Sequence, residues 1–137
     1  MVMRGWPWLG LALALFAVLV GVLRGAAWLR DPHRLVWIGL PLYMLHQFEE
    51  HGIDLTGQRF AFQASLCHTI GHKGPIGTCA ATEAFIFAVN VGSVWIAMTI
   101  AGMAGPKRAT FTLAALGIPV VNAMAHIVPA VRTGTYN

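Results

Sequence analysis

The stretch WIGLPLYMLHQFEEHG, residues Trp37–Gly52, decides how this chain folds. An uncharged, apolar run leads to His46, and Glu49, Glu50 and His51 follow directly behind it. On a helix, Glu49 and Glu50 lie three and four positions after His46, so both carboxylates share a face with its imidazole. Ionisable groups at membrane depth cost roughly a few kcal/mol each unless they share a partner. We therefore interpret this segment as a helix whose polar end forms a site.

The composition of the chain is that of a membrane protein. Of its 137 residues, 57% are hydrophobic and 10% are charged, whereas roughly a quarter of a soluble protein is charged. Four segments approach the roughly twenty apolar residues that cross a hydrocarbon core: Trp6–Leu23, Leu35–Phe48, Thr82–Met103 and Phe111–Val131. They predict an all-α integral membrane bundle of about four transmembrane helices, forming one domain over residues 1–137. The second segment is the shortest, and it spans only if its HQFEEH residues lie at membrane depth.

The connection over residues 52–81 has a different composition. Its polar residues alternate with Phe60, Phe62, Leu66 and Ile70, which predicts a loop with a short amphipathic helix lying on the face of the membrane. Cys67 and Cys79 both fall in this connection. They are either a disulfide, if this side faces an oxidising compartment, or two buried thiols. His68 and His72 have ligand spacing, but in a wet loop we expect both to be solvated.

Basic residues at the segment ends predict the orientation. Two connections carry most of them: one holds Arg24, Arg30 and Arg34, and the other holds Lys107 and Arg108. The positive-inside rule places both connections in the cytoplasm and therefore places residues 52–81 outside. The basic residues form no stripe interleaved with aromatics, so we do not expect nucleic-acid binding.

Aromatic residues near the start of the chain suggest how the first helix is anchored. Trp6 and Trp8 flank Pro7, and tryptophans at a helix end are typical of the membrane interface. We therefore expect this pair to form part of an interfacial belt, on a first helix that is retained and is not a cleaved signal.

Under this topology the polar residues of three helices fall in the outer half of the bilayer. The third helix carries Glu83 and Asn90, and the fourth carries Asn122 and His126, four positions apart. We expect His46, either Glu49 or Glu50, and His126 to converge on one internal pocket. Two histidines with carboxylates are ligands suited to zinc, iron or manganese.

These residues support several functions. The leading hypothesis is a metal-dependent enzyme, a hydrolase or an oxidoreductase, acting on a lipid-soluble or membrane-proximal substrate. Its metal ligands would be drawn from His46, Glu49, Glu50 and His126. The catalytic candidates are Glu49, Glu50 and Asn122. Further pocket candidates are His51, Glu83 and Asn90. A metal-free acid/base isomerase, a cation or proton-coupled transporter, and an accessory subunit of a larger assembly are the alternatives. Transport is disfavoured because the polar residues occupy one layer and form no ladder across the membrane.

The two motifs together resemble a known family. His46-Gln47-Phe48-Glu49-Glu50 with Asn122-Ala123-Met124-Ala125-His126 is similar to the family named for its HxxEE motif, a group of small bacterial integral membrane proteins. By position, the family's motif residues are His46, Glu49, Glu50, Asn122 and His126, and Asn90 resembles the polar residue of its central helix. The resemblance implies a proposed metal-dependent enzyme, of function not established, in the bacterial inner membrane. Members continue past a Tyr-Asn-Pro-Gly turn, whereas this chain stops at Tyr136-Asn137, so we expect a helix to be missing, or to be supplied by a partner or a second copy.

Overall fold

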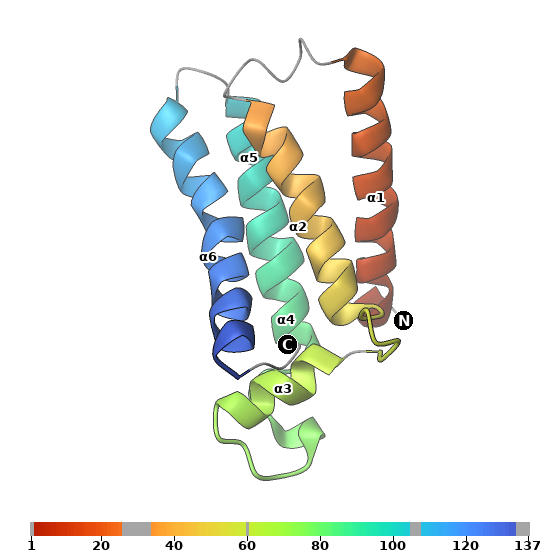
Figure 1. The fold of residues 1–137 in the computed structure, drawn as a ribbon, viewed down its shortest axis with the longest axis vertical. Coiled ribbons are helices and arrows are strands. Elements are labelled where there is room, and N and C mark those ends of the chain that lie inside the picture. The colour runs from red at the N-terminus through yellow and green to blue at the C-terminus, as the bar shows by residue number, and fades with distance from the viewer. Residues whose placement is uncertain (1, 26–33, 60, 105–107, 134–137) are drawn as a thin grey trace.

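The computed structural model describes residues 2–25, 34–59, 61–104 and 108–133. Long helical rods run up and down beside one another (Figure 1). They are α1 (Val2–Arg24), α2 (Leu35–His51), a composite third rod, and α6 (Ala109–Thr133). The described residues contain no strand, only a single bridge between Ile53 and Arg59. The predicted all-α bundle is confirmed.

Three of the rods are long and apolar enough to cross a membrane. These spans are Arg4–Arg24, Glu83–Ala104 and Thr110–Val128. The 17-residue α2 is shorter, as the sequence indicated, and it packs against all three of the others. Because neighbours surround it, α2 can bury polar side chains at its carboxyl end. Gln47, Glu50 and His51 are all buried there.

The third rod changes its helical winding twice. It consists of α4 (Glu83–Phe87), the π-helix η4 (Ala88–Trp95) and α5 (Ile96–Ala104). Thr82 caps α4 by accepting a hydrogen bond from the Phe85 amide at 3.1 Å. The π-helix was not expected, because hydrophobic periodicity does not distinguish it from an α-helix. π-Helical turns occur frequently at functional sites.

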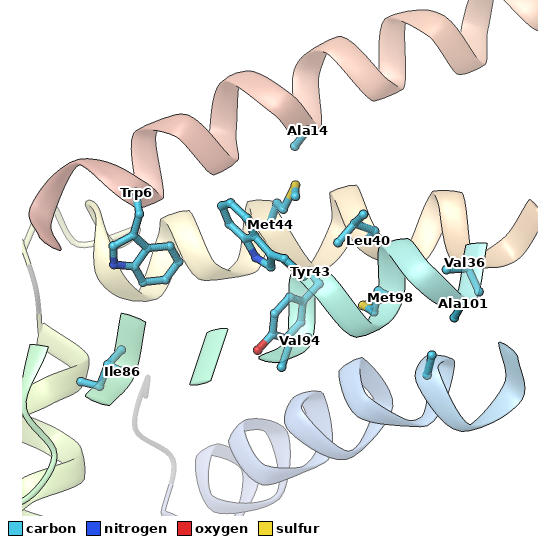
Figure 2. Close-up of a cluster of buried hydrophobic side chains, with 12 residues drawn as sticks. Trp6, Ala14, Val36, Leu40, Tyr43, Met44, Ile86, Val94, Met98 and Ala101 are labelled. Atoms are coloured by element: carbon cyan, nitrogen blue, oxygen red, sulfur yellow. The ribbon is translucent and has the colours of Figure 1, made fainter. Parts of the chain in front are cut away.

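The core lies between α1, α2, the third rod and α6 (Figure 2). Trp6 packs there, only 5% exposed, with its ring centroid 5.9 Å from that of Trp95 and 5.1 Å from that of His51. The prediction that Trp6 belongs to an interfacial belt is therefore wrong, whereas Trp8 does lie on the surface. The sequence could not separate the two, because both stand near one helix end and only packing decides which of them turns inward.

Glycines let the rods approach closely. A Cβ on Gly102 would lie 2.6 Å from the Trp37 ring, and a Cβ on Gly10 would lie 3.0 Å from the Trp95 ring. Small residues are the usual means of close approach between membrane helices, since lipid offers no hydrophobic drive for association. The two bulky indoles therefore need glycine opposite them.

The described basic residues of the two predicted cytoplasmic connections lie at one end of the bundle, as the predicted orientation requires. The end of α1, the start of α2, the end of α5 and the start of α6 share one end of the bundle, opposite α3 (Figure 1). Arg24, Arg34 and Arg108 therefore lie at the same end. Arg30 and Lys107, which contribute to the orientation argument, lie outside the described residues, as do Tyr136 and Asn137.

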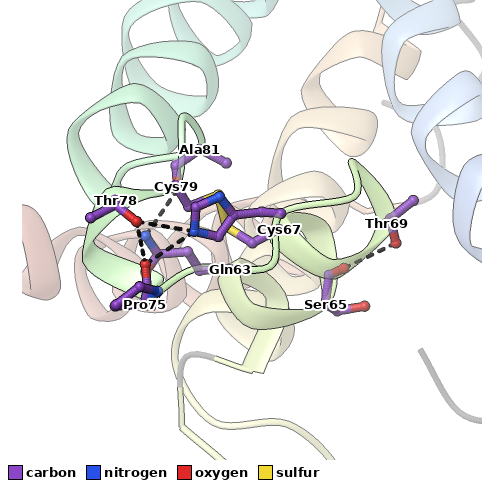
Figure 3. Close-up of a disulfide and its surroundings, with 9 residues drawn as sticks. Gln63, Ser65, Cys67, Thr69, Pro75, Thr78, Cys79 and Ala81 are labelled. Atoms are coloured by element: carbon purple, nitrogen blue, oxygen red, sulfur yellow. Dashed lines mark hydrogen bonds between the residues drawn. A yellow bond between two sulfur atoms is a disulfide. The ribbon is translucent and has the colours of Figure 1, made fainter.

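The connection between α2 and the third rod folds across the other end of the bundle. It contains α3 (Ala61–Thr69), the predicted short helix, and the 3-10 turn η3 (Ile76–Thr78). Cys67 and Cys79 form a disulfide, which resolves the two alternatives left by the sequence, and Gln63 donates to the Ala81 carbonyl at 2.9 Å (Figure 3). Two attachments therefore join α3 to the segment that leads into α4.

A tight turn precedes α3. The Asp54 carboxylate accepts hydrogen bonds from the Thr56 hydroxyl at 2.7 Å and from the Gln58 amide at 2.7 Å. These donors, the Thr56 hydroxyl above all, hold the pKa of Asp54 below its usual value because they favour the charged form. The Asp54 carboxylate thus stabilises the turn.

We expect Gly102→Ala to lower the thermal unfolding midpoint of the detergent-purified protein. The added methyl group meets the Trp37 ring, and overpacking of this kind costs about 1–3 kcal/mol. Gly21→Ala is the matched control, because a Cβ on Gly21 has nothing within 4 Å and alanine favours a helix. Equal midpoints for the two variants would contradict the packing.

Wild-type Cys67 and Cys79 should resist alkylation under denaturing conditions until a reductant is added. The double variant Cys67→Ser/Cys79→Ser should unfold at lower temperature, since a bridge over a sequence separation of 12 contributes about 2–4 kcal/mol. Mass spectrometry of alkylated protein and a thermal melt measure the two effects. Alkylation without reductant would disprove the bridge.

Candidate metal centre

One buried carboxylate lies at the centre of the polar cluster. Glu50, in the last turn of α2, is 8% exposed. Its Oε1 lies 2.7 Å from His126 Nε2, and its Oε2 lies 3.5 Å from both His46 Nε2 and His51 Nε2. Gln47 Nε2 donates a hydrogen bond to the same Oε2 at 3.1 Å. Three imidazoles therefore surround one carboxylate.

The spacing along α2 explains this arrangement. His46, Gln47 and Glu50 share a helix face, because residues three and four positions apart are neighbours on a helix. His51 follows directly after Glu50 and is rotated about 100° around the axis. Its ring packs between Trp6 of α1 and Phe62 of α3, at centroid distances of 5.1 and 4.8 Å.

The second half of the cluster comes from α6. Asn122 and His126 lie one turn apart and face α2. Asn122 Nδ2 donates to His46 Nε2 at 2.7 Å, and the His46 and His126 ring centroids are 5.2 Å apart. The HxxEE stretch and the Asn122 to His126 stretch, 76 residues apart, thus meet in a single site.

The donor set fits a divalent metal ion. One ligand atom each from His46, Glu50 and His126 lie within 4.8 Å of one another. Two ligands of one ion are separated by at most twice the bond length, about 4.4 Å, so small side-chain shifts bring all three into range. Within the described part of the chain, the buried nitrogens His51 Nε2 and His126 Nδ1 lack a hydrogen-bond partner. Three protein ligands with one open position are typical of catalytic zinc sites.

Two of the predicted carboxylates lie elsewhere. Glu49 Oε1 accepts a hydrogen bond from the Leu55 amide at 3.4 Å, in the loop after α2. Glu83 forms an ion pair with Arg4 at 2.8 Å and joins α4 to α1. Of the adjacent pair of glutamates, the fold selects Glu50, because successive residues on a helix point in different directions.

A cavity of about 650 Å³ adjoins Glu50. It lies between α2, α4, η4 and α6, with Phe62 and Leu66 of α3 also on its wall, and its lining is mostly apolar. Asn122, and the predicted pocket residues His51 and Asn90, line this cavity. Glu83 does not.

The cavity wall holds a second polar pair, in which Asn90 was a predicted pocket residue and Tyr43 was not. The Tyr43 hydroxyl donates to Asn90 Oδ1 at 2.6 Å, and Asn90 Nδ2 donates to the Ile86 carbonyl at 3.0 Å. Tyr43 stands one turn before His46 on the same face of α2, and this spacing was the available signal. Gln47 was also missed, although it lies three positions before Glu50 on the same helix face. Phe62 carried no signal, since its position depends on how α3 folds back.

We expect Tyr43→Phe to destabilise the protein by about 1 kcal/mol or more, because it leaves the buried Asn90 Oδ1 without a donor. The double variant Tyr43→Phe/Asn90→Ala should cost less than the sum of the single changes, as removing both partners leaves no orphaned acceptor. Reversible unfolding in detergent measures the free energy of unfolding of the wild type, the two single variants and the double variant. Strict additivity would show that the two side chains do not interact.

Comparison with known proteins gives one match. A family model described as "Protein of unknown function with HXXEE motif" matches residues 37–137, which include both halves of the cluster. No curated protein and no solved structure matches the chain. The match begins at Trp37, in the first turn of α2, and it includes the rest of α2 and every later helix through α6. The chain therefore belongs to the HXXEE family.

Proposed function

We propose that this protein is a membrane-embedded metal-dependent enzyme acting on a lipid-soluble or membrane-proximal substrate. The observation that carries the proposal is the convergence of three ligand atoms from two helices, His46 and Glu50 of α2 with His126 of α6, within 4.8 Å. Glu50 also lines the apolar cavity, so the cluster has access to space for a substrate. A purely structural tie between α2 and α6 would not need three titratable groups.

The residues have distinct roles in this proposal. When bound, zinc, iron or manganese supplies an activated water or a polarised substrate oxygen. Gln47 fixes the rotamer of Glu50 through its hydrogen bond to Oε2, and Asn122 holds the ring of His46. His51 is the nearest further group that can take or give a proton, since its Nε2 lies 3.5 Å from Glu50. It replaces Glu49 in that role, because Glu49 turns toward Leu55.

The distribution of polar groups favours an enzyme over a transporter. The cluster occupies one end of the bundle, beside α3. Toward the opposite end the buried side chains of the described residues are apolar apart from Thr112, and they include Val36, Leu40, Met98 and Ala101. A relay across the membrane needs ionisable groups along its length, and the described core provides none there.

One observation favours a second candidate, a metal-free acid/base catalyst. The Asn122 amide donates to His46 Nε2, an atom that a metal ion at this site would use. Glu50 then links three imidazoles by itself, an arrangement that can hold and pass a proton. In this reading the cluster supports isomerisation, and the metal content of the protein separates the two candidates.

The location follows from the spans and the disulfide. We propose an inner-membrane protein whose α3 end faces an oxidising compartment, because the bridge between Cys67 and Cys79 persists only there. The basic residues at the opposite end are consistent with a cytoplasmic side.

Metal analysis of purified protein tests the leading proposal. Wild-type protein supplemented with zinc, manganese and iron should carry about one equivalent of metal, and Glu50→Gln and His126→Ala should lose most of it, as ligand removal does. Glu49→Gln is the matched control, since the neighbouring carboxylate lies outside the cluster. His68→Ala controls for an exposed histidine.

The outcomes separate the candidates. Metal-free wild-type protein after supplementation would exclude the metalloenzyme and leave the acid/base reading. Equal loss of metal in Glu49→Gln and Glu50→Gln would refute the assignment of Glu50 as the ligand.

A further inference from the structure

We propose that the cavity beside Glu50 binds a neutral, single-chain amphiphile, a long-chain alcohol or its ester, which enters sideways from the bilayer between η4 and α6. The inference rests on the proposed function, in that the reacting end of the molecule is taken to lie at the Glu50 end of the cavity. Its physical basis is the position of the opening, the polarity along the cavity, and the charge of its lining.

The opening faces the hydrocarbon region of the bilayer. Three of the lining side chains are exposed apolar groups: Phe85 is 56% exposed, Val89 40% and Val121 70%. All three stand on helices that are long and apolar enough to span a membrane. An exposed apolar side chain within such a span contacts lipid. A molecule dissolved in the bilayer therefore reaches the cavity without crossing water.

The water-facing end of the cavity is covered by α3. Phe62 lies against both His51 and His126, at centroid distances of 4.8 and 5.8 Å, and Leu66 also contributes to the wall. The disulfide at Cys67 holds this helix in place (Figure 3). α3 therefore shields the polar end from the aqueous side and leaves the lateral route open.

Polarity changes along the length of the cavity. Its lining on α6 extends from Ala114 to Ala125, which is about 16 Å along the axis at about 1.5 Å per residue. Asn122 and Glu50 lie toward the α3 end, and Val94 and Ala114 lie toward the middle of the bundle. An elongated molecule fits with its polar group at Glu50 and its chain directed toward the bilayer centre.

The lining also selects the charge and size of the molecule. Among the described residues that line the cavity, none is Lys or Arg. An anionic phosphate or carboxylate would therefore face Glu50 without a permanently charged cation in the lining to offset it. A volume of about 650 Å³ lies within the range for one small molecule, roughly 300–1,000 Å³. This favours one chain over a two-chain phospholipid.

Photolabelling tests the proposal. The whole 137-residue chain, stripped of metal with a chelator, is reconstituted into phosphatidylcholine vesicles with a long-chain alcohol that carries a diazirine on its chain. We expect labelled peptides from η4 and from residues 114–121 of α6. Gly117→Leu should reduce this labelling by about tenfold, equivalent to about 1.4 kcal/mol, because a Cβ on Gly117 has nothing within 4 Å and its side chain would fill the cavity.

Two controls keep the result interpretable. Gly21→Leu adds the same side chain on α1, where a Cβ also has nothing within 4 Å, and should label as wild type. Ala114→Phe fills the cavity from a second position and should behave like Gly117→Leu. Unchanged labelling of the lipid-facing surface of α1 shows that each variant is folded.

Several results would overturn the proposal. The first is equal labelling of wild type, Gly117→Leu and Ala114→Phe. The second is stronger cavity labelling by the matching long-chain carboxylate or by a diazirine phospholipid. The third is full competition by a short, water-soluble alcohol, which would show an aqueous route. Since the protein is metal-free throughout, this experiment and the metal analysis fail independently. A labelled cavity in a protein that never binds metal would support the amphiphile and leave only the acid/base candidate.

Discussion

The structure depends on the burial of one carboxylate. A charged group in the apolar interior is costly unless nearby groups compensate for it, and Glu50 is almost fully enclosed. Its compensation comes from His46, Gln47 and His51 on its own helix and from His126 on α6. The requirement that these groups meet sets the register of α6 against α2, and it places the Asn122 to His126 stretch at the level of the HxxEE stretch.

The surrounding packing encloses the same end of the bundle. α2 is short and central, so its carboxyl end is covered by α1, α6 and α3. Trp6 closes one side of His51 and Phe62 closes another, and α3 is in turn held by the disulfide at Cys67. Apolar walls strengthen every electrostatic contact inside them, because water no longer screens the charges. An enclosed His and Glu cluster beside an apolar cavity thus has the environment that the proposed chemistry requires.

The π-helix connects this packing to the cavity. η4 carries Asn90, whose side chain makes two hydrogen bonds. Its Oδ1 accepts from the Tyr43 hydroxyl of α2, and its Nδ2 donates to the backbone carbonyl of Ile86 in the same rod. π-Helical turns are frequent at functional sites, and this one carries a residue of the cavity wall. The pair gives the mostly apolar wall a further polar position partway along the cavity, between the metal-ligand candidates and the middle of the bundle.

Much of the fold was determined by the sequence alone. Long apolar runs specify spanning helices because backbone groups in hydrocarbon must bond internally, and the spacing of His46 and Glu50, and of Asn122 and His126, specifies shared helix faces. The tertiary structure decided which members of these patterns meet. It selected Glu50 over Glu49, directed Glu83 to Arg4, turned Trp6 inward, and brought Tyr43 to Asn90. Periodicity defines the face of a helix, but the rotation of one helix against another is set by close packing, here by glycines opposite indoles and by the partners that one buried carboxylate requires.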